Sequence, residues 1–466
     1  MESVIKIKKG LDISIQGSAA REVADALDIS TYAVCPDDYV GFEPRLLKAE
    51  GDAVAAGEAL MSHKGDPRLR LCSPVSGTVR AIVRGAKRHI EAVVVETDGD
   101  QTSPAGDPIS DSTSRQVIVD AMLQNGLWAM LRQRPFGTMA NPDLKPKGVF
   151  VSCFDSAPLA PDYDFVLQGR DDDFAAGLRL LARLAEAPVH LGFRPRQRLA
   201  SLPLPDGCKA HHFDGPHPAG NVGTQIARID PINKGDTVWT VNLQDAAILG
   251  HWARTGQYRP EKVVAFAGPT AAHPQYYRLI AGACIQPLTT QQHDADTLPR
   301  IRHISGNILS GTQIAPSGFL HAHDNMISVL PEGSYHEFMG WLRPGLLKFS
   351  ASRTFLSGFL PASAARRSDK SALGALQRHL RFDTNLHGGV RPLVFGEQWE
   401  HLFPFDIYPT QLVKAAAIGD IELMERLGIL ELEPEDLALC EFADTSKTEL
   451  QALIRQGLEL IRLSSL

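Results

Sequence analysis

Residues 51–79 read GDAVAAGEALMSHKGDPRLRLCSPVSGTV, and this stretch decides the fold of the N-terminal part. Gly51 and Gly57 allow a positive φ beside short strands, and Pro74 and Gly77 favour a corner where the chain returns. On both sides of the stretch, apolar and polar residues alternate between glycines, which is typical of strands and turns. The pattern predicts a small all-β barrel or sandwich over residues 1–100.

The same stretch resembles the barrel-sandwich hybrid of biotinyl and lipoyl carriers, with its G-D-x-V-x-x-G-x-x-L, a hairpin, and then S-P-x-x-G-x-V. A carrier would use Lys64 as its swinging-arm lysine. However, Lys64 lies nine residues before Ser73, with Gly65, Asp66 and Pro67 inserted, which is farther than carriers place the modified lysine. The usual Asp-Lys or Met-Lys-Met signature is also absent. We expect a scaffold without a covalent cofactor, and a carrier or binding module is the alternative.

The composition indicates a multidomain globular chain. Its 466 residues are 44% hydrophobic and 22% charged, which is too long for one core, so we expect roughly three or four domains. The net charge of -7 gives no cationic field for nucleic acid. Charges interrupt every apolar run, and residues 1–16 contain no continuous apolar stretch, so we expect neither a transmembrane helix nor an export signal.

A polar, glycine- and proline-containing stretch after residue 97 reads as a linker, and the pattern then changes to alternating strands and helices. This alternation predicts a Rossmann-like α/β domain over residues 101–260 with a parallel sheet. The expected strands are 148–154, 164–169, 189–193 and the apolar runs near 240 and 262–268. The expected helices are 115–136, 171–188 and 243–256.

The last two parts differ from this pattern. Short β-type segments at 282–288, 300–311 and 326–333 predict a small sheet-plus-helix module over residues 261–345. Helical spacing dominates residues 346–466 and predicts a mainly helical domain. Its expected helices begin near proline, aspartate or threonine and cover 372–380, 409–419, 421–429, 434–442 and 447–463. The acidic run 431–436 reads as exposed and could form a docking surface.

Cysteine and histidine spacing argues against a redox or metal centre. The six cysteines are scattered and include no C-x-x-C pair, so we expect no disulfide framework and no iron–sulfur cluster, as in a reducing compartment. His211, His212 and His217, or His321 and His323, could offer metal nitrogens. No cysteine or carboxylate stands beside them at a metal-ligand spacing, so we expect no metal site. No catalytic motif is present either, and we expect no catalytic residue.

The loop HHFDGPHPAGNVGT, residues 211–224, is the candidate binding segment. A glycine-rich loop between a strand and a helix can present backbone amides to an anion or let a planar ligand approach closely. Its glycines do not form G-x-G-x-x-G, and the chain has no G-K-[ST] phosphate loop. A stiff structural turn is therefore the alternative. The candidate residues are Gly215, Pro216, His217, Pro218, Gly220, Gly223 and Thr224.

Read in order, the segments resemble the A subunit family of the Na+-translocating NADH:quinone oxidoreductase over essentially the whole chain. The similar pieces are IKIKKGLDISIQG, the 51–88 stretch, GPHPAGNVGT, DTVWTVNLQDAAILG, VVAFAGP, SGNILSG with VLPEG and GWLRPG, and the segment from FPFDIYPTQ to LCEF. Each piece is short, but they occur in one order.

This resemblance implies a peripheral subunit on the cytoplasmic face of the bacterial inner membrane. It would dock on the integral B subunit of a complex that passes electrons from NADH to ubiquinone and exports Na+. Flavins, iron–sulfur centres and NADH would be bound by other subunits, and this chain would bind no cofactor. Ubiquinone would be the substrate of the complex, and His217 or Thr224 could donate a hydrogen bond to a quinone carbonyl. The implied domain order is barrel-sandwich hybrid, Rossmann-like, SLBB/β-grasp and helical.

The sequence departs from the family at two places. EFADTSKTEL follows Cys440 where relatives continue with a second cysteine, and Gln225 and Ala227 stand where relatives tend to carry histidines. The second departure leaves the quinone contact open. An Rnf-type electron-transfer subunit is the alternative from the enzyme class, but it would need cysteine quartets that the chain lacks.

Overall fold

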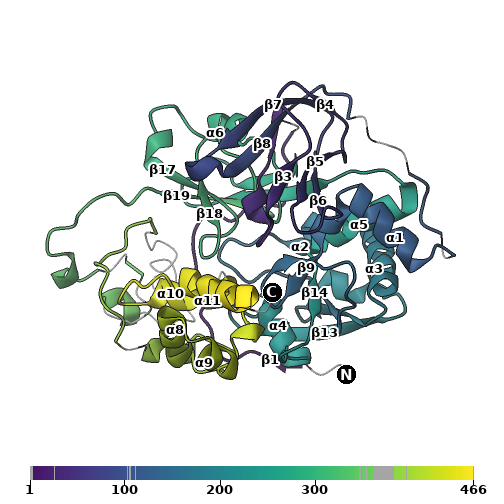
Figure 1. Cartoon of the computed structure of the whole chain (residues 1–466). Helices are drawn as coiled ribbons and strands as arrows, with labels where there is room; N and C mark the ends of the chain where they lie inside the picture. Colours follow the sequence, from purple (N-terminus) through teal and green to yellow (C-terminus); the bar gives the residue numbers. More distant parts are fainter. Residues whose placement is uncertain are drawn as a thin grey trace.

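The computed structural model describes residues 4–464 apart from 26, 102, 104–105, 111, 346–347, 350, 352–354, 360–381 and 395. The helix expected at 372–380 lies outside the described residues. Figure 1 shows the N-terminal sheets above, the large α/β sheet with its helices at the right, and the C-terminal helices at the lower left.

The N-terminal part consists of two small antiparallel sheets that face one another. One sheet has the order β2-β8-β7-β4 and the other has the order β3-β5-β6. Val79, Val95 and Leu60 are almost fully buried between them, as the alternation along β7 predicts. The strands are β2 Thr31–Val34, β3 Pro44–Leu46, β4 Ala53–Val54, β5 Ala59–His63, β6 Arg70–Cys72, β7 Gly77–Arg84 and β8 Ile90–Thr97, with short 3-10 turns η1 Pro36–Asp38 and η2 Ala86–Arg88.

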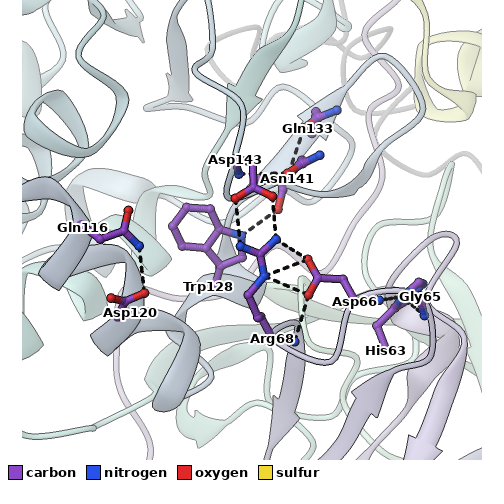
Figure 2. A network of polar contacts seen from close by, with 11 residues as sticks. His63, Gly65, Asp66, Arg68, Gln116, Asp120, Trp128, Gln133, Asn141 and Asp143 are labelled. Atoms are coloured by element: carbon purple, nitrogen blue, oxygen red, sulfur yellow. Dashed lines mark hydrogen bonds and ion pairs between the residues drawn. The ribbon is translucent and has the colours of Figure 1, made fainter.

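The hairpin that carries Lys64 is tied to the neighbouring domain. Arg68 donates to both carboxylate oxygens of Asp143, at 2.8 and 2.6 Å, and also to Asp66 (Figure 2). The backbone amides of Gly65 and Asp66 donate to Nδ1 of His63. Carrier hairpins project freely so that the arm can swing, whereas this one is anchored at its tip. The anchoring favours the scaffold interpretation of Lys64, which stays a prediction.

The α/β part is built on a seven-stranded sheet in the order β1-β13-β12-β11-β14-β9-β10. The strands from β1 to β14 pair in parallel, and β9 and β10 add antiparallel pairs at one edge. The strands are β1 Val4–Lys6, β9 Arg132–Arg134, β10 Thr138–Met139, β11 Val149–Ser152, β12 Val189–Phe193, β13 Cys208–Asp214 and β14 Val238–Thr240.

Two long helices of this part pack closely on each other. They are α3 Asp171–Ala185 and α5 Leu243–Thr255. A Cβ on Gly177 would lie 1.8 Å from the carbonyl oxygen of Ala246, and one on Gly250 would lie 1.7 Å from that of Asp173. The two glycines therefore permit the close approach of the helices. The other helical elements are α1 Arg115–Gln124, η3 Leu127–Met130, α2 Tyr163–Val166, η4 Arg198–Ser201 and α4 Val222–Ile229.

Four local predictions for these parts are wrong. The first strand, β1, pairs in parallel with β13 of the large sheet and not with the sandwich. The expected strand at 164–169 is helix α2, whose first turn is capped by Asp162. The expected helix at 115–136 ends at Gln124, because Gly126 adopts a left-handed conformation, and residues 132–134 form β9. The run 262–268, expected in the α/β sheet, belongs to the next sheet.

The third part is a five-stranded mixed sheet in the order β16-β15-β19-β17-β18. Its strands are β15 Glu261–Ala267, β16 Gln275–Ile280, β17 Ile301–Ser305, β18 Thr312–Ile314 and β19 Met326–Pro331. The β segment expected at 282–288 is wrong, because α6 Gln286–Gln292 begins there with Pro287 in its first turn. The 3-10 turn η5 Leu298–Arg300 leads into β17, and η6 Gly340–Leu342 and η7 Leu356–Phe359 follow the sheet.

The C-terminal helices enclose a hydrophobic core of their own around Trp399, Phe403 and Leu412. The helices expected from 409 to 463 are present, and Pro409 and Pro434 occupy first-turn positions. The acidic run 431–436 is not an exposed surface, because Glu433 and Asp436 are buried. The elements are η9 Glu397–His401, α8 Pro409–Ile418, α9 Ile421–Arg426, η10 Ile429–Glu431, η11 Pro434–Leu437, α10 Ala438–Ala443 and α11 Leu450–Ser464. Among the helices of the described residues, none combines the length and the apolar character that crossing a membrane requires.

Candidate functional site

The loop predicted as a binding segment connects β13 to α4, and its central residues 217–220 are buried. A Cβ on Gly215 would lie 2.2 Å from the carbonyl oxygen of Ile7, so the N-terminal segment lies directly against the loop. The structure brings the seven candidate residues together, and the N-terminal segment occupies the space next to Gly215.

His217 is held inside the loop in its neutral form. The Ser156 hydroxyl accepts a hydrogen bond from the Gly220 amide at 2.8 Å and lies 3.0 Å from Nδ1 of His217. The amide of His217 donates to Asp12 at 2.9 Å. Burial lowers the pKa of His217 to about 4, although the charge of Glu435 acts in the opposite direction. The imidazole is therefore a positioned, uncharged group at neutral pH.

The other end of the loop meets the C-terminal helices. A Cβ on Gly223 would lie 2.5 Å from Nη1 of Arg134 and 2.5 Å from Oδ1 of Asp436. Arg134 is buried and donates to Glu435 at 2.6 Å and to Asp436 at 3.2 Å. The Thr224 hydroxyl is buried and has no hydrogen-bond partner among the described residues. This end of the loop is thus a junction between two domains, and the Thr224 hydroxyl and Oδ1 of Asp436 both lack a hydrogen-bond partner among the described residues.

The described residues also enclose a small cavity of about 70 Å³ where the sandwich, the α/β part and the five-stranded sheet meet. Leu71, Pro74 and Ile248 contribute to its apolar wall. A cavity of this size has room for several water molecules. Its polar lining comes from all three parts and includes Asp38, Tyr39, Asp245, Tyr258, Lys262 and His323.

A buried ion pair forms the floor of this junction cavity. Nζ of Lys262 lies 2.8 Å from Oδ1 of Asp245, and both side chains are about as buried as any in the core, at 2% and 3% exposed. The same ammonium group donates to the carbonyl of Ala322 at 2.8 Å. Because Lys262 is the second residue of β15 and Asp245 lies in the first turn of α5, this pair joins the α/β part to the five-stranded sheet.

Three aromatic side chains line the same cavity. The rings of Tyr39 and His323 are 5.1 Å apart in an edge-to-face arrangement. Burial raises the pKa of the Tyr39 and Tyr258 hydroxyls, with Asp38 adding to the effect at Tyr39, and burial lowers the pKa of His323. At neutral pH these groups are uncharged hydrogen-bonding partners. Asp38 fixes the adjoining segment by accepting from the Ala322 amide and by pairing with His321.

Sequence reasoning missed the junction cavity. Tyr39, Asp245 and Lys262 lie in three different domains, and no motif connects them. One signal was present in the chain, since Lys262 is a charged residue beside the buried apolar run 263–267. A lysine in that position needs a buried partner or a functional role.

Two of the histidines considered as metal ligands interact with other side chains. His211 lies 3.0 Å from the ring of His190, and His321 pairs with Asp38 at 2.7 Å. In the part of the chain that the structure describes, no group of three potential metal-ligating side chains comes together. The six cysteines form no disulfide. Burial raises the pKa of the Cys35 and Cys72 thiols beside the junction cavity to about 12, so both are protonated and unreactive.

Comparison with known proteins identifies the family. Family models described as the NqrA N-terminal barrel-sandwich hybrid domain, the NqrA second alpha/beta domain and the NQRA C-terminal domain match residues 5–98, 113–258 and 263–315. The A subunit of the Na+-translocating NADH-quinone reductase of Rhodopirellula baltica is 38% identical over 99% of this chain and 98% of its own length. The corresponding subunits of Serratia proteamaculans and Pasteurella multocida are 38% and 37% identical, each over 98% of this chain and 99% of their own. The chain belongs to the NqrA family of this reductase.

Membership of the NqrA family confirms the main functional prediction. The chain is a subunit of a respiratory complex that couples NADH-quinone reduction to sodium translocation, and enzymatic activity belongs to the complex. The matched models also confirm a barrel-sandwich hybrid domain, an α/β domain and an SLBB-type domain, in that order. These matches do not favour an Rnf-type subunit or a carrier.

Proposed function

We propose that this chain contributes to quinone binding in the complex and that the quinone head group contacts the junction cavity. The arrangement of Tyr39, Tyr258 and Lys262 around one apolar-walled space supports the proposal. A quinone needs a flat apolar slot and one or two hydrogen-bond donors for its carbonyls. The two hydroxyls are uncharged donors, and the Lys262 ammonium is held in place by Asp245.

The loop of residues 215–224 is the second candidate for the quinone contact. The Thr224 hydroxyl, which is unpaired among the described residues, supports it, since a ligand carbonyl would satisfy that donor. The close packing around His217 favours a structural role for the rest of the loop. The proposed quinone is ubiquinone, which is the substrate of the complex and not a resident cofactor of this chain.

Photolabelling with an azido-ubiquinone on the purified complex distinguishes the two candidates. We expect labelled peptides from residues 33–39, 126–130 or 258–262 of this chain, and excess unlabelled quinone should compete with the label. Label confined to residues 215–224 would favour the loop instead. Label only on other subunits would contradict both quinone assignments, while leaving family membership untouched.

We further propose that the chain docks on the integral B subunit through an exposed apolar surface. This surface is supported by seven large apolar side chains on two neighbouring segments, with Phe338 84% exposed and Val390 76% exposed. Asn385 joins the two segments by donating to the carbonyls of Gly333 and Tyr335, at 2.9 and 2.6 Å. Exposed apolar groups that gather in this way are typical of interaction sites. The seven residues are Tyr335, Phe338, Met339, Leu342, Leu386, Val390 and Val394.

Charged substitutions test this docking surface. Phe338→Asp and Val390→Asp should reduce co-purification of the chain with the B subunit from membranes, because each places an unpaired charge in an apolar interface. Ile418→Asp is the matched control, since Ile418 is 77% exposed at the end of α8 and lies outside the surface. If the two surface variants assemble as well as the control, the docking surface is elsewhere.

The proposed location is the cytoplasmic face of the inner membrane, with the chain held there by its partner. We propose that NADH, flavins and iron–sulfur centres are bound by other subunits.

The α/β domain is proposed to be a Rossmann-like unit that does not bind a dinucleotide. This is supported by the parallel strands β13-β12-β11-β14 and by the N-terminal segment that occupies the space beside the β13–α4 loop. The separate core around Leu412 supports a C-terminal helical domain. A visible spectrum of the purified chain tests the proposal that other subunits bind the flavins. Absorbance at ~450 nm would contradict the absence of flavin from this chain.

A further inference from the structure

A second hollow lies on the five-stranded sheet, and none of its lining residues lines the junction cavity. It has a volume of about 450 Å³, within the usual range for small-molecule pockets. Leu298, Pro299, Ile314 and Pro316 contribute apolar walls, and Gln313 and Glu332 contribute polar groups. The hollow is open to solvent and is lined by apolar and polar side chains together.

His303 is the residue of this hollow that needs a partner. It lies in the middle of β17, opposite Ile314 of β18 and Val329 of β19, and is only 1% exposed. No side chain among the described residues pairs with either ring nitrogen, although the ring interacts with the backbone of Ile301. Buried polar groups are nearly always paired, so a buried imidazole that no side chain satisfies at a hollow indicates a missing partner.

His293 adds a further unpaired nitrogen next to the His303 ring. The rings of His293 and His303 are 5.7 Å apart and nearly perpendicular, and Nε2 of His293 is buried without a partner among the described residues. The other neighbour of the His293 ring is Phe266, at 6.1 Å. The two histidines thus form a compact polar group at the edge of an apolar core.

Both imidazoles are uncharged at neutral pH. Burial lowers the pKa of His303 to about 4, and the neighbouring His293 lowers it further, while the carbonyl of Ile301 acts in the opposite direction. Burial also lowers the pKa of His293. A neutral imidazole has one N–H donor and one acceptor nitrogen, so its natural partner carries a donor and an acceptor close together.

The charges near the hollow disfavour an anion. Glu332 is already paired with Arg302, at 2.6 Å, and also accepts from the Thr384 hydroxyl. The arginine is therefore neutralised, and the neutral histidines offer no positive charge to a carboxylate or phosphate. A transition-metal ion would need at least one more ligand, and no group of three potential ligands occurs in the described residues.

We propose that the hollow beside His303 is a binding site for an uncharged, planar small molecule that carries a hydrogen-bond donor and acceptor side by side, as an aromatic amide does. The ring of the ligand lies against Leu298, Pro299 and Pro316, and its polar end pairs with His303. Its lining residues are not shared with the junction cavity, so this proposal does not rest on the proposed quinone contact.

Benzamide is the test probe, with benzoate as its charged counterpart. The full-length chain, labelled with ¹⁵N in its 16 histidines, is titrated with each compound while the ring-nitrogen resonances are followed by NMR. We expect benzamide to shift the His303 and His293 resonances in a saturable way and to bind at least tenfold more tightly than benzoate. Zinc ions serve as a third probe.

Two variants and one control localise the binding. His303→Phe keeps the ring volume and removes both nitrogens, and Ala315→Trp fills the hollow from its exposed rim without replacing a buried residue. Each should weaken benzamide binding at least tenfold, whereas His89→Phe, at an exposed site in the sandwich, should leave it unchanged. Unchanged affinity in the Ala315→Trp variant, equal binding of benzoate, or zinc binding at the two histidines in place of benzamide would overturn the proposal.

Discussion

Arg134 and Glu435 are separated by 301 positions in the sequence, yet Nη2 of the arginine lies 2.6 Å from Oε1 of the glutamate. Arg134 is the last residue of β9, and Glu435 lies in η11. Together with Asp436, this contact joins the C-terminal helices to the edge of the α/β sheet. A second arginine, Arg455, reinforces the junction by donating to the carbonyl of Phe136 and to Glu433.

Loss of the Arg134 charge should weaken this junction strongly. Arg134→Met leaves the buried Asp436 without its cation, which costs about 3–5 kcal/mol for a buried pair. We expect the free energy of unfolding to fall by that amount in denaturant titrations and residues 400–464 to become sensitive to limited proteolysis. Arg254→Met is the control, since Arg254 pairs with Asp173 at the surface and should change stability by about 0–1 kcal/mol. Equal effects in the two variants would contradict the junction role.

Gly223 should not tolerate a side chain at the same junction. A Cβ there would lie 2.5 Å from both Arg134 and Asp436, so Gly223→Ala should destabilise the chain by about 1–3 kcal/mol through overpacking. Gly389→Ala is a matched control, because no atom of the described residues lies within 4 Å of its Cβ position. Thermal unfolding of both variants checks the prediction, which fails if Gly223→Ala melts like the control.

The pair Lys262 and Asp245 should show strong coupling. Lys262→Met or Asp245→Leu alone leaves one buried charge unpaired and should cost about 3–5 kcal/mol, whereas the double variant should lose less than either single variant. A double-mutant cycle on the free energy of unfolding measures this coupling. Additive losses would mean that the two charges do not depend on each other. The double variant also removes a donor from the proposed quinone contact, so the azido-ubiquinone label in the junction cavity should decrease.

Acid should destabilise the chain in part through His217. Its pKa is about 4 in the folded chain and about 6.5 in an unfolded one, so below pH 6.5 the unfolded state binds a proton that the folded state does not. Stability from this residue is complete above pH 6.5 and is lost as the pH falls towards 4, by about 2 kcal/mol at pH 5.

Stability measured from pH 7 to pH 5 in His217→Gln tests this effect. The variant should lose less stability over that range than the parent chain, whatever its stability at pH 7. His89→Gln, at an exposed site, should follow the parent. A pH profile of His217→Gln parallel to that of the parent would show that the imidazole titrates normally.

Local sequence patterns were reliable where one segment determines its own structure. The turns around Gly51 and Gly57 and the alternation along 77–84 predicted the sandwich, and helical spacing predicted α3, α8 and α11. The errors occurred where local signals conflict or where pairing is remote. Asp162 caps the first turn of α2, so residues that were predicted as a strand form a helix. The strand β1 pairs with β13, more than two hundred residues away in the sequence.

The sequence by itself determined the family, the order of the domains and the absence of closely spaced cysteines, because motifs and spacings are properties of a continuous chain. Only the tertiary structure decided which polar groups meet. Lys262 joins Asp245, Arg134 joins Asp436, and His303 is buried beside a hollow without a side-chain partner among the described residues. The physical reason is that a buried charge or donor must be satisfied by whatever group the packing of distant segments brings near it, and local periodicity contains no information about that partner.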